Sequence, residues 1–268
     1  MSAQGFAEVN GTRLYYETAG VGDAVVFVHG FTLDTRMWDD QFEAFAQRYR
    51  VIRYDARGFG KSALPDGTPY APHDDLKAVL EHLGVERAHV VALSMGGGIG
   101  IDFALTYPHM TRTLVAVDAV VGGWRWSDEE VKHTKLRNEA TASEGIPGAK
   151  RAWLANPLFA PANEQPTVAA RLVQIVEDYS GWHFVHDNPT VSLKPRAFER
   201  LGHITAPTLV ILGERDVADF QGMADALAAR VPNARKIVLP NVGHMSNMEA
   251  PHAFNDVVLG WLEEQSKG

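Results

Sequence analysis

A single serine between an apolar run and a cluster of glycines constrains the fold of this chain more than any other feature. Residues 89–98 read HVVALSMGGG, so a β-prone segment leads directly into Ser94 and the glycines follow Met95. This pattern is typical of a sharp, strained turn from a strand into a helix, where small neighbours let the chain double back. Ala92 replaces the first glycine of G-x-S-x-G and adds only one methyl group. The stretch therefore predicts a strand, an exposed serine and a helix.

Two later strand-like segments place an acid and a histidine downstream of the serine. Residues 207–213 and 236–240 are apolar runs of strand length, and Asp216 and His244 follow them. Ser94, Asp216 and His244 thus occur in that order, each just after the carboxyl end of a predicted strand. This order differs from the two common protease orders. In an open, mostly parallel sheet these strand ends meet in one crevice.

Three further segments complete a resemblance to a known family. Residues 29–31 (HGF) and 55–62 (DARGFGKS) each follow a predicted strand, and residues 244–251 (HMSNMEAP) lead into the last helix. Over nearly its whole length the chain resembles the α/β-hydrolase superfamily, in the group of small capped esterases, lactonases and non-haem perhydrolases. The resemblance implies a mostly parallel, eight-stranded sheet flanked by helices, a helical cap inserted after the sixth strand, and a Ser–His–Asp site.

The segments outside this insertion alternate between strand and helix patterns. Asn10-Gly11 is the strongest short signal for a hairpin. The alternation that follows predicts a parallel sheet with helices on both faces. The predicted strands are 6–9, 12–18, 24–28, 51–54, 89–93, 114–117, 207–213 and 236–240, and the predicted helices outside the insertion are 38–48, 74–83, 96–107 and 251–264.

The alternation stops between residues 121 and 198. Prolines separate its predicted helices, which are 128–139, 148–155 and 167–179. By the resemblance, 121–198 is a helical cap domain, and 1–120 together with 199–268 form the core domain. A cap supplies apolar walls over the crevice, so its four tryptophans are the candidates for the substrate pocket, and we expect at least two of them to pack within the cap instead; an insertion that merely lengthens the core is the alternative. The four tryptophans are Trp124, Trp126, Trp153 and Trp182.

The three candidate catalytic residues have separate roles. Ser94 is a poor nucleophile alone and needs a base to take its proton, which is the role expected of His244. Asp216 would hold the tautomer of His244 and stabilise its imidazolium form. Asp118 is a rival acid, because it follows the sixth strand at a position that some members of the superfamily use. A serine that only caps the following helix is the alternative for Ser94.

Stabilising the reaction intermediate requires two backbone N–H groups that form an oxyanion hole. One comes from the residue after the nucleophile, which is Met95. By resemblance, the other comes from Phe31, the residue after His29-Gly30.

Composition excludes several classes of function. The chain has 268 residues, of which 46% are apolar, and a net charge of −8. That charge argues against a nucleic-acid or acidic-membrane surface, because both need basic patches. The absence of cysteine excludes disulfides and thiolate metal sites, and His183-x-x-His186-Asp187 is only a weak alternative metal motif. The amino terminus does not resemble a signal peptide, so the sequence predicts a cytoplasmic protein. A Ser–His–Asp site is expected to need neither cofactor nor metal.

The predicted function is hydrolysis of a small carboxylic ester, acyclic or lactone, through an acyl-Ser94 intermediate. Serine at position 94 excludes the relatives with an aspartate nucleophile. Carbon–carbon bond hydrolases of aromatic degradation share the triad but usually carry Asp-Arg where this chain has Asp216-Val217. Enol-lactonases and perhydrolases usually have a proline shortly after that aspartate, which residues 217–220 (VADF) lack. A signalling receptor with slow hydrolysis is a further alternative, since residues 29–38 are similar to those of such receptors.

Overall fold

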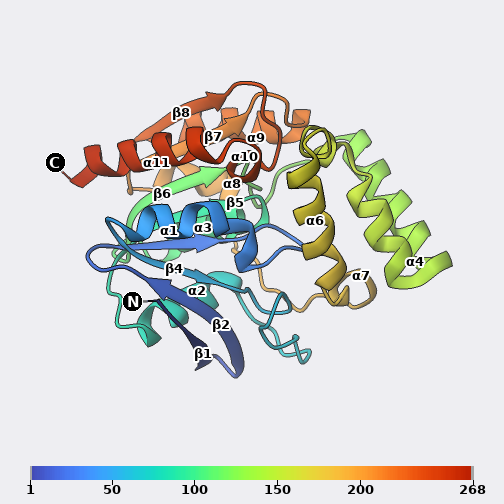
Figure 1. Ribbon diagram of the computed structural model, residues 1–268, viewed down its shortest axis with the longest axis horizontal. Helices are drawn as coiled ribbons and strands as arrows, with labels where there is room; N and C mark the ends of the chain where they lie inside the picture. The colour runs from blue at the N-terminus through green and yellow to red at the C-terminus, as the bar shows by residue number, and fades with distance from the viewer. Residues whose placement is uncertain (1, 267–268) are drawn as a thin grey trace.

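An eight-stranded sheet forms the centre of the structure, a computed structural model that describes residues 2–266 (Figure 1). The strands are β1 (Ala3–Val9), β2 (Thr12–Ala19), β3 (Ala24–Val28), β4 (Arg50–Tyr54), β5 (Ala88–Leu93), β6 (Thr111–Val117), β7 (Thr208–Gly213) and β8 (Ala234–Leu239). Their spatial order is β1-β2-β4-β3-β5-β6-β7-β8. β3 to β8 pair in parallel, whereas β2 is antiparallel to both β1 and β4. The predicted mostly parallel sheet is confirmed.

The predicted hairpin is also present, between β1 and β2. Val9 pairs with Thr12 across the turn. The two turn residues, Asn10 and Gly11, have φ angles of 48° and 69°. Both angles are positive, as the two-residue turns that match the twist of a hairpin require, and asparagine and glycine adopt them at little cost.

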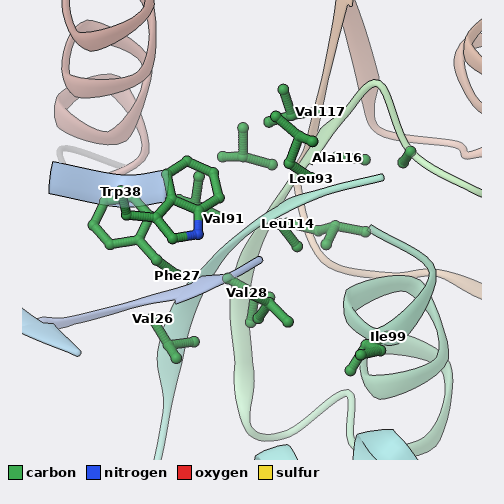
Figure 2. Close-up of a cluster of buried hydrophobic side chains, with 14 of the residues drawn as sticks. Val26, Phe27, Val28, Trp38, Val91, Leu93, Ile99, Leu114, Ala116 and Val117 are labelled. Atoms are coloured by element: carbon green, nitrogen blue, oxygen red, sulfur yellow. The ribbon is translucent and has the colours of Figure 1, made fainter. Parts of the chain in front are cut away.

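The central strands are buried because helices cover both faces of the sheet. Every residue of β3, β5 and β7 is buried, which explains why these strands read as continuous apolar runs rather than alternating ones. Phe27 stacks on Trp38 with 4.8 Å between the ring centroids, and the ring of Phe45 lies 5.1 Å from that of Phe27. Val91 pairs in register with Phe27 and therefore shares this face (Figure 2).

The opposite face of the same strands packs against α3. Successive side chains of a strand point to opposite faces, so Val90 and Ala92 lie on the other side from Val91. A Cβ atom at Gly100 of α3 would lie 3.1 Å from the Cβ of Ala92 and 3.2 Å from Cγ1 of Val90. A glycine at this point therefore lets the helix approach the sheet closely.

The helices outside the insertion are α1 (Asp39–Ala46), α2 (Pro72–His82), α3 (Met95–Thr106), α9 (Ala218–Arg230), α10 (Ser246–Glu249) and α11 (Pro251–Ser266), with the 3-10 helix η1 (Thr35–Trp38) before α1. Four of them, α1, α2, α3 and α11, lie close to their predicted positions, whereas α9 and α10 were not predicted. α1 packs on α11, α2 on α3, and α9 on β7 and β8. Within residues 2–266, every helix is too short or too polar to span a lipid bilayer.

Helices alone fill the sequence between β6 and β7. They are α4 (Asp128–Leu154), η2 (Pro157–Phe159), α5 (Ala160–Asn163), α6 (Pro166–Asp178), α7 (Trp182–Val185), α8 (Ala197–Arg200) and η3 (Leu201–His203). Figure 1 shows α4, α6 and α7 together at one end of the molecule, on the right of the view. The helices predicted at 128–139 and 148–155 are parts of α4, which is kinked at Gly145 (φ 65°), two residues before Pro147. Proline and glycine are common causes of such kinks.

The strand order creates a crevice at the carboxyl edge of the sheet. β3 lies between β4 and β5, so the chain leaves β3 toward one side and later returns on the other. Ligands of open parallel sheets bind at such a switch point, outside the carboxyl ends of the strands. The segments that follow β3, β5, β6, β7 and β8 all begin at this edge.

Candidate active site

Ser94 lies at the turn from β5 into α3 with an unusual backbone conformation. Its φ and ψ angles are 57° and −118°, a region that a residue with a side chain adopts only when its surroundings hold it there. Its N–H donates to the carbonyl of Val117 at 3.0 Å, and its carbonyl accepts from the N–H groups of Gly98 and Val120 at 3.1 and 3.0 Å. The hydrogen bonds to β6 and to the segment after it therefore hold this strained turn in place.

The glycines after Ser94 allow α3 to start directly against neighbouring backbone. A Cβ atom at Gly96 would lie 2.3 Å from the carbonyl oxygen of Val28, and one at Gly97 would lie 2.4 Å from Cβ of Ala119. Neither distance is possible for real atoms without movement of the chain. The glycine run is thus explained by close packing behind the turn.

His244 and Asp216 form a buried hydrogen-bonded pair. Nδ1 of His244 lies 2.8 Å from Oδ2 of Asp216, and the residues are 1% and 4% exposed. The carboxylate also accepts from the N–H of Val217 at 2.7 Å. Since the carboxylate accepts from Nδ1–H, the neutral ring keeps its lone pair on Nε2. That Nε2 atom is buried and has no hydrogen-bond partner within residues 2–266.

Ser94 and His244 line one small cavity at the edge of the sheet. Its other lining residues are Gly30, Phe31, Leu33, Leu93, Trp153, Leu158, Phe159 and Met245. The structure therefore brings the predicted nucleophile and base together, with residues of the predicted oxyanion hole beside them. The ring of Phe220 lies 4.3 Å from that of His244 and restricts its movement.

Glu249 fixes the loop that carries His244, a role that the sequence did not reveal. Its Oε2 accepts from the N–H of Gly243 at 2.7 Å and its Oε1 from the N–H of Met245 at 3.0 Å. The carboxylate thus holds the backbone on both sides of His244. Burial raises the pKa of Glu249, and these two hydrogen bonds oppose that shift. The glutamate stands five residues after the histidine, but its spacing alone does not indicate this contact.

Asp118, the rival acid, lies beneath the pair rather than against the imidazole. It is fully buried, with its carboxylate contacting the N–H of Gly213 at 2.8 Å and Oγ of Ser246 at 2.7 Å. Burial raises its pKa well above the usual range, and the negative charge of Asp216 raises it further. The imidazole of His244 hydrogen-bonds to Asp216, whereas Asp118 joins the ends of β7 and the loop after β8.

The residues of the two predicted oxyanion donors, Phe31 and Met95, line a cavity together with Ser94. Nδ1–H of His29 donates to the carbonyl of Gly30 at 2.8 Å, while its Nε2 accepts from the N–H of Ala56 at 2.9 Å. Because that carbonyl and the N–H of Phe31 belong to one peptide unit, His29 sets the direction of both. The N–H of Met95 is the first of α3. Within residues 2–266, neither N–H donates a hydrogen bond to the protein.

A larger cavity of about 440 Å³ opens above Ser94. The residues that line it are Phe31, Ser94, Met95, Val120, Trp126, Glu130, Val131, Thr134, Arg137, Trp153, Leu158 and Phe220. Two of the four candidate tryptophans, Trp126 and Trp153, are among them. Trp124 instead donates from Nε1 to Asp219 at 2.9 Å, and Trp182 stacks on His186. These two rings pack within the protein away from the cavity lining.

One face of α4 contributes polar residues to this cavity that the sequence did not single out. Glu130, Thr134 and Arg137 stand at positions i, i+4 and i+7 and therefore share a face of the helix. The spacing is visible in the sequence. Whether this face or the opposite one covers a site depends on how α4 packs, which the sequence pattern does not indicate.

The weak metal motif near residue 183 is used for packing in the structure. His183 stacks on Phe59 with 4.4 Å between ring centroids and bonds the hydroxyl of Tyr179 at 2.7 Å. Burial lowers the pKa of His183 to about 4. Within residues 2–266 no three histidine or carboxylate side chains are grouped as a metal ion would require.

Comparison with known proteins agrees with this geometry. The model of the family described as the alpha/beta hydrolase fold matches residues 23–251. The chain belongs to the α/β-hydrolase family. The resemblance drawn from the residues is thereby confirmed, and the chain is a hydrolase.

The chain is similar to several named hydrolases over most of its length. A protein of Caulobacter that bears the name of a carbamate hydrolase, RutD, is 32% identical, with 94% of this chain and 97% of that protein covered. The 2-hydroxy-6-oxononadienedioate/2-hydroxy-6-oxononatrienedioate hydrolase of Cupriavidus pinatubonensis is 30% identical, with coverages of 93% and 90%. The solved structure of Est816, described as an N-acyl homoserine lactone degrading enzyme, is 27% identical with a TM-score of 0.78, over 96% of this chain and 99% of that one.

Proposed function

We propose that this α/β-hydrolase cleaves carboxylic esters, acyclic or lactone, through an acyl intermediate on Ser94. The observation that carries the proposal is the hydrogen bond of 2.8 Å from His244 to Asp216, with Nε2 of the same ring unpaired within residues 2–266. Ser94 lines the same cavity as that ring. A base held in the correct tautomer beside a serine hydroxyl is the arrangement that acyl transfer requires.

The reaction proceeds in two similar halves. Nε2 of His244 takes the proton of Ser94 as its oxygen attacks the carbonyl carbon, and then gives that proton to the departing alkoxide. In the second half, His244 takes a proton from a water molecule, which attacks the acyl-serine. The acid leaves, and the proton passes from His244 to the oxygen of Ser94. Asp216 holds the imidazole in place and stabilises its charged form.

The negative charge of each tetrahedral intermediate falls on the former carbonyl oxygen. The N–H groups of Phe31 and Met95 would donate to it, because both are free of protein acceptors within residues 2–266 and belong to rigid peptide units. Such preorganised donors are worth about 10²- to 10³-fold in rate each.

Apolar walls and local sequence favour an ester or lactone as the substrate. Trp126, Trp153 and Phe220 line the larger cavity, and apolar walls of this kind bind acyl or alcohol groups. The likeness to Est816, described as a lactone-degrading enzyme, supports the lactone branch. Val217 stands where carbon–carbon bond hydrolases usually carry arginine, which argues against that reaction.

Carbamate hydrolysis is a second candidate, supported by the 32% identity to the protein named RutD. The same residues would attack a carbamate carbonyl and protonate a nitrogen or oxygen leaving group. The two candidates differ only in the group attached to the carbonyl.

A panel of substrates with different reactive groups separates these functions. Purified enzyme is given aryl and alkyl esters of graded acyl length, γ- and δ-lactones, alkyl carbamates and a vinylogous 1,5-diketone acid, and the turnover number is measured for each. We expect many rapid turnovers on at least one ester or lactone. Higher kcat/KM on carbamates favours the second candidate, and highest kcat/KM on the diketone acid favours carbon–carbon cleavage. A single slow acylation on every compound indicates a receptor and contradicts the proposal.

A further inference from the structure

Arg137 places an unpaired positive charge in the wall of the cavity above Ser94. It belongs to α4 and lines the cavity of about 440 Å³ together with Ser94. Its guanidinium carbon lies 5.7 Å from the ring centroid of Trp153 and 5.8 Å from that of Phe184. No side chain or carbonyl within residues 2–266 forms an ion pair or hydrogen bond with it. The charged group therefore lies close to two aromatic rings, and its N–H donors have no protein acceptor within residues 2–266.

An arginine in this condition is costly to the folded protein unless something else pairs with it. Arg137 is half-buried, and burial lowers its pKa because the charged form loses hydration. The more deeply buried arginines of the same chain do have partners. Arg53 pairs with Glu17 at 2.6 Å, and Arg57 pairs with Asp75 at 2.9 Å. The contrast indicates that the partner of Arg137 comes from outside the protein.

The other charged residue in the cavity wall, Glu130, interacts with Arg137 through space but does not contact it. Glu130 lies on the same face of α4, two turns earlier, but the two side chains form no ion pair within the described residues 2–266. Burial raises the pKa of Glu130, and the positive charge of Arg137 opposes that shift through space without a direct contact. Thr134, between them on the helix face, is uncharged.

A row of contacts connects Arg137 to the reaction centre. Trp153, beneath the guanidinium, lies 5.4 Å from the ring of Phe31 and donates from Nε1 to Oγ1 of Thr32 at 2.8 Å. Phe31 carries a proposed oxyanion N–H. One aromatic ring thus separates the guanidinium from the residue expected to bind the scissile carbonyl, so a single small ligand can contact both.

We propose that Arg137 binds a carboxylate group of the substrate, so that the preferred substrates are esters or lactones that also carry a free carboxylate. A carboxylate matches the fork of N–H donors on a guanidinium and can accept two parallel hydrogen bonds. This inference rests on the proposed ester hydrolysis at Ser94, and it adds the charge of the substrate to that function.

Matched pairs of substrates test the proposal on each side of the scissile bond. Monomethyl esters of dicarboxylic acids, from succinate to suberate, place the carboxylate on the acyl side, and methyl alkanoates of equal length are their neutral partners. ω-Acetoxyalkanoates and the matching alkyl acetates do the same on the alcohol side. We expect kcat/KM to favour the anionic member in one of the two series, with an optimum at one chain length.

Variants then show whether the preference depends on Arg137. In Arg137→Met, which keeps a long stem without charge, the anionic-to-neutral ratio of kcat/KM should fall about 10- to 100-fold, as expected for a hydrogen-bonded charge pair. Arg137→Lys should retain part of the preference. Arg125→Met is the matched control, because Arg125 is exposed and lies outside the cavity lining; its ratio should equal that of the wild type.

Several outcomes overturn the proposal. One is an equal kcat/KM for charged and neutral esters at every length in both series. Another is a fall in kcat/KM in Arg137→Met that is equal for the anionic and the neutral member of a pair. If the wild type cleaves no ester at all, the proposed hydrolysis is wrong, and the role of Arg137 is then tested by ligand binding alone. Monomethyl adipate and 4-acetoxybutanoate should then raise the melting temperature of Ser94→Ala, and of Ser94→Ala/Arg125→Met, but not that of Ser94→Ala/Arg137→Met. A rise of equal size in all three contradicts the role of Arg137.

Discussion

Two regions of the site differ in how firmly the fold holds them. One is the edge of the sheet that carries Ser94, and the other is helix α4, which lines the cavity above it. Ser94, Asp216 and His244 are each 9% exposed or less, and the strained turn and the His–Asp pair are held by hydrogen bonds. α4 has 27 residues, of which only Gly148, Ala149 and Lys150 are buried. The sheet edge is therefore built for fixed geometry, whereas α4 contributes side chains that stay partly solvated.

The two regions therefore have different roles in the proposed reaction. Acyl transfer depends on distances between reacting atoms that must be kept within fractions of an ångström, so its residues need support on every side. Recognition of a remote group tolerates looser packing. We therefore expect substitutions at the sheet edge to lower the rate for every substrate, and substitutions in the cavity wall to change the ratio between substrates.

Ser94→Ala should have the largest effect, because it removes the proposed nucleophile. We expect kcat on esters to fall about 10⁶-fold, the loss seen when a triad serine is removed, with little change in melting temperature. Steady-state kinetics and thermal unfolding measure the two effects. Ser192→Ala, at an exposed serine, is the control. Near wild-type turnover in a pure sample of Ser94→Ala would refute the assignment.

Asp216→Asn should have the second largest effect. Asparagine has one acceptor oxygen, and when that oxygen accepts from the N–H of Val217 its NH2 group faces Nδ1, so the histidine adopts the wrong tautomer and its charged form loses the stabilising carboxylate. We expect kcat to fall about 10⁴-fold, equally for acetate and octanoate esters. A loss that differs strongly between these two substrates would mean that the sheet edge also sets specificity.

Trp126→Ala should change selectivity more than rate. Trp126 lines the larger cavity and packs 5.9 Å from Phe220, so its removal takes contacts from long acyl chains. We expect the octanoate-to-acetate ratio of kcat/KM to fall about tenfold. Trp182→Ala, outside the lining, should leave this ratio near that of the wild type. Uniform loss on both esters in Trp126→Ala would make the residue structural.

Asp118→Asn should have the smallest effect on activity. We expect kcat to fall less than about tenfold, which corresponds to the free energy of one ordinary hydrogen bond. Because burial and Asp216 raise the pKa of Asp118, the side chain tends to be protonated and neutral, as asparagine is. A larger loss of kcat than in Asp216→Asn would show that Asp118 is the acid of the triad.

The same variant also makes a prediction for stability. Above the usual pKa of 3.8 and below the raised value, folded Asp118 holds a proton that the unfolded chain loses. The free energy of unfolding of the wild type therefore falls as pH rises through that window. Asparagine has no such proton, so the stability of Asp118→Asn relative to the wild type should rise between pH 5 and pH 8. Urea denaturation at both pH values measures this, and an unchanged difference would contradict it.

Much of the fold could be read from local patterns. Strands such as β3 and β5 are short apolar runs bounded by turn residues, and Asn10-Gly11 specifies its hairpin by its own backbone preferences. Ser94 is recognisable because the strained turn demands small neighbours on both sides. Each of these signals depends on a few consecutive residues.

The parts that could not be read depend on contacts between distant segments. Glu249 braces the loop of His244, and Asp118 lies under Asp216 rather than against the imidazole, through side-chain geometry that no spacing encodes. Likewise, four tryptophans of one segment were candidates for the pocket, and the sequence did not indicate that Trp126 and Trp153 are the two that line it. A large aromatic ring packs equally well in a core or in a cavity wall.

The sequence by itself determined the sheet, the helices around it and the order of Ser94, Asp216 and His244, because periodicity and turn chemistry are local properties of the chain. Only the tertiary structure decided which carboxylate meets the imidazole, which face of α4 lines the cavity, and that Arg137 stands there without a partner. Those outcomes are set by the close packing of side chains that are far apart in the sequence, where shifts of an ångström decide between contact and none.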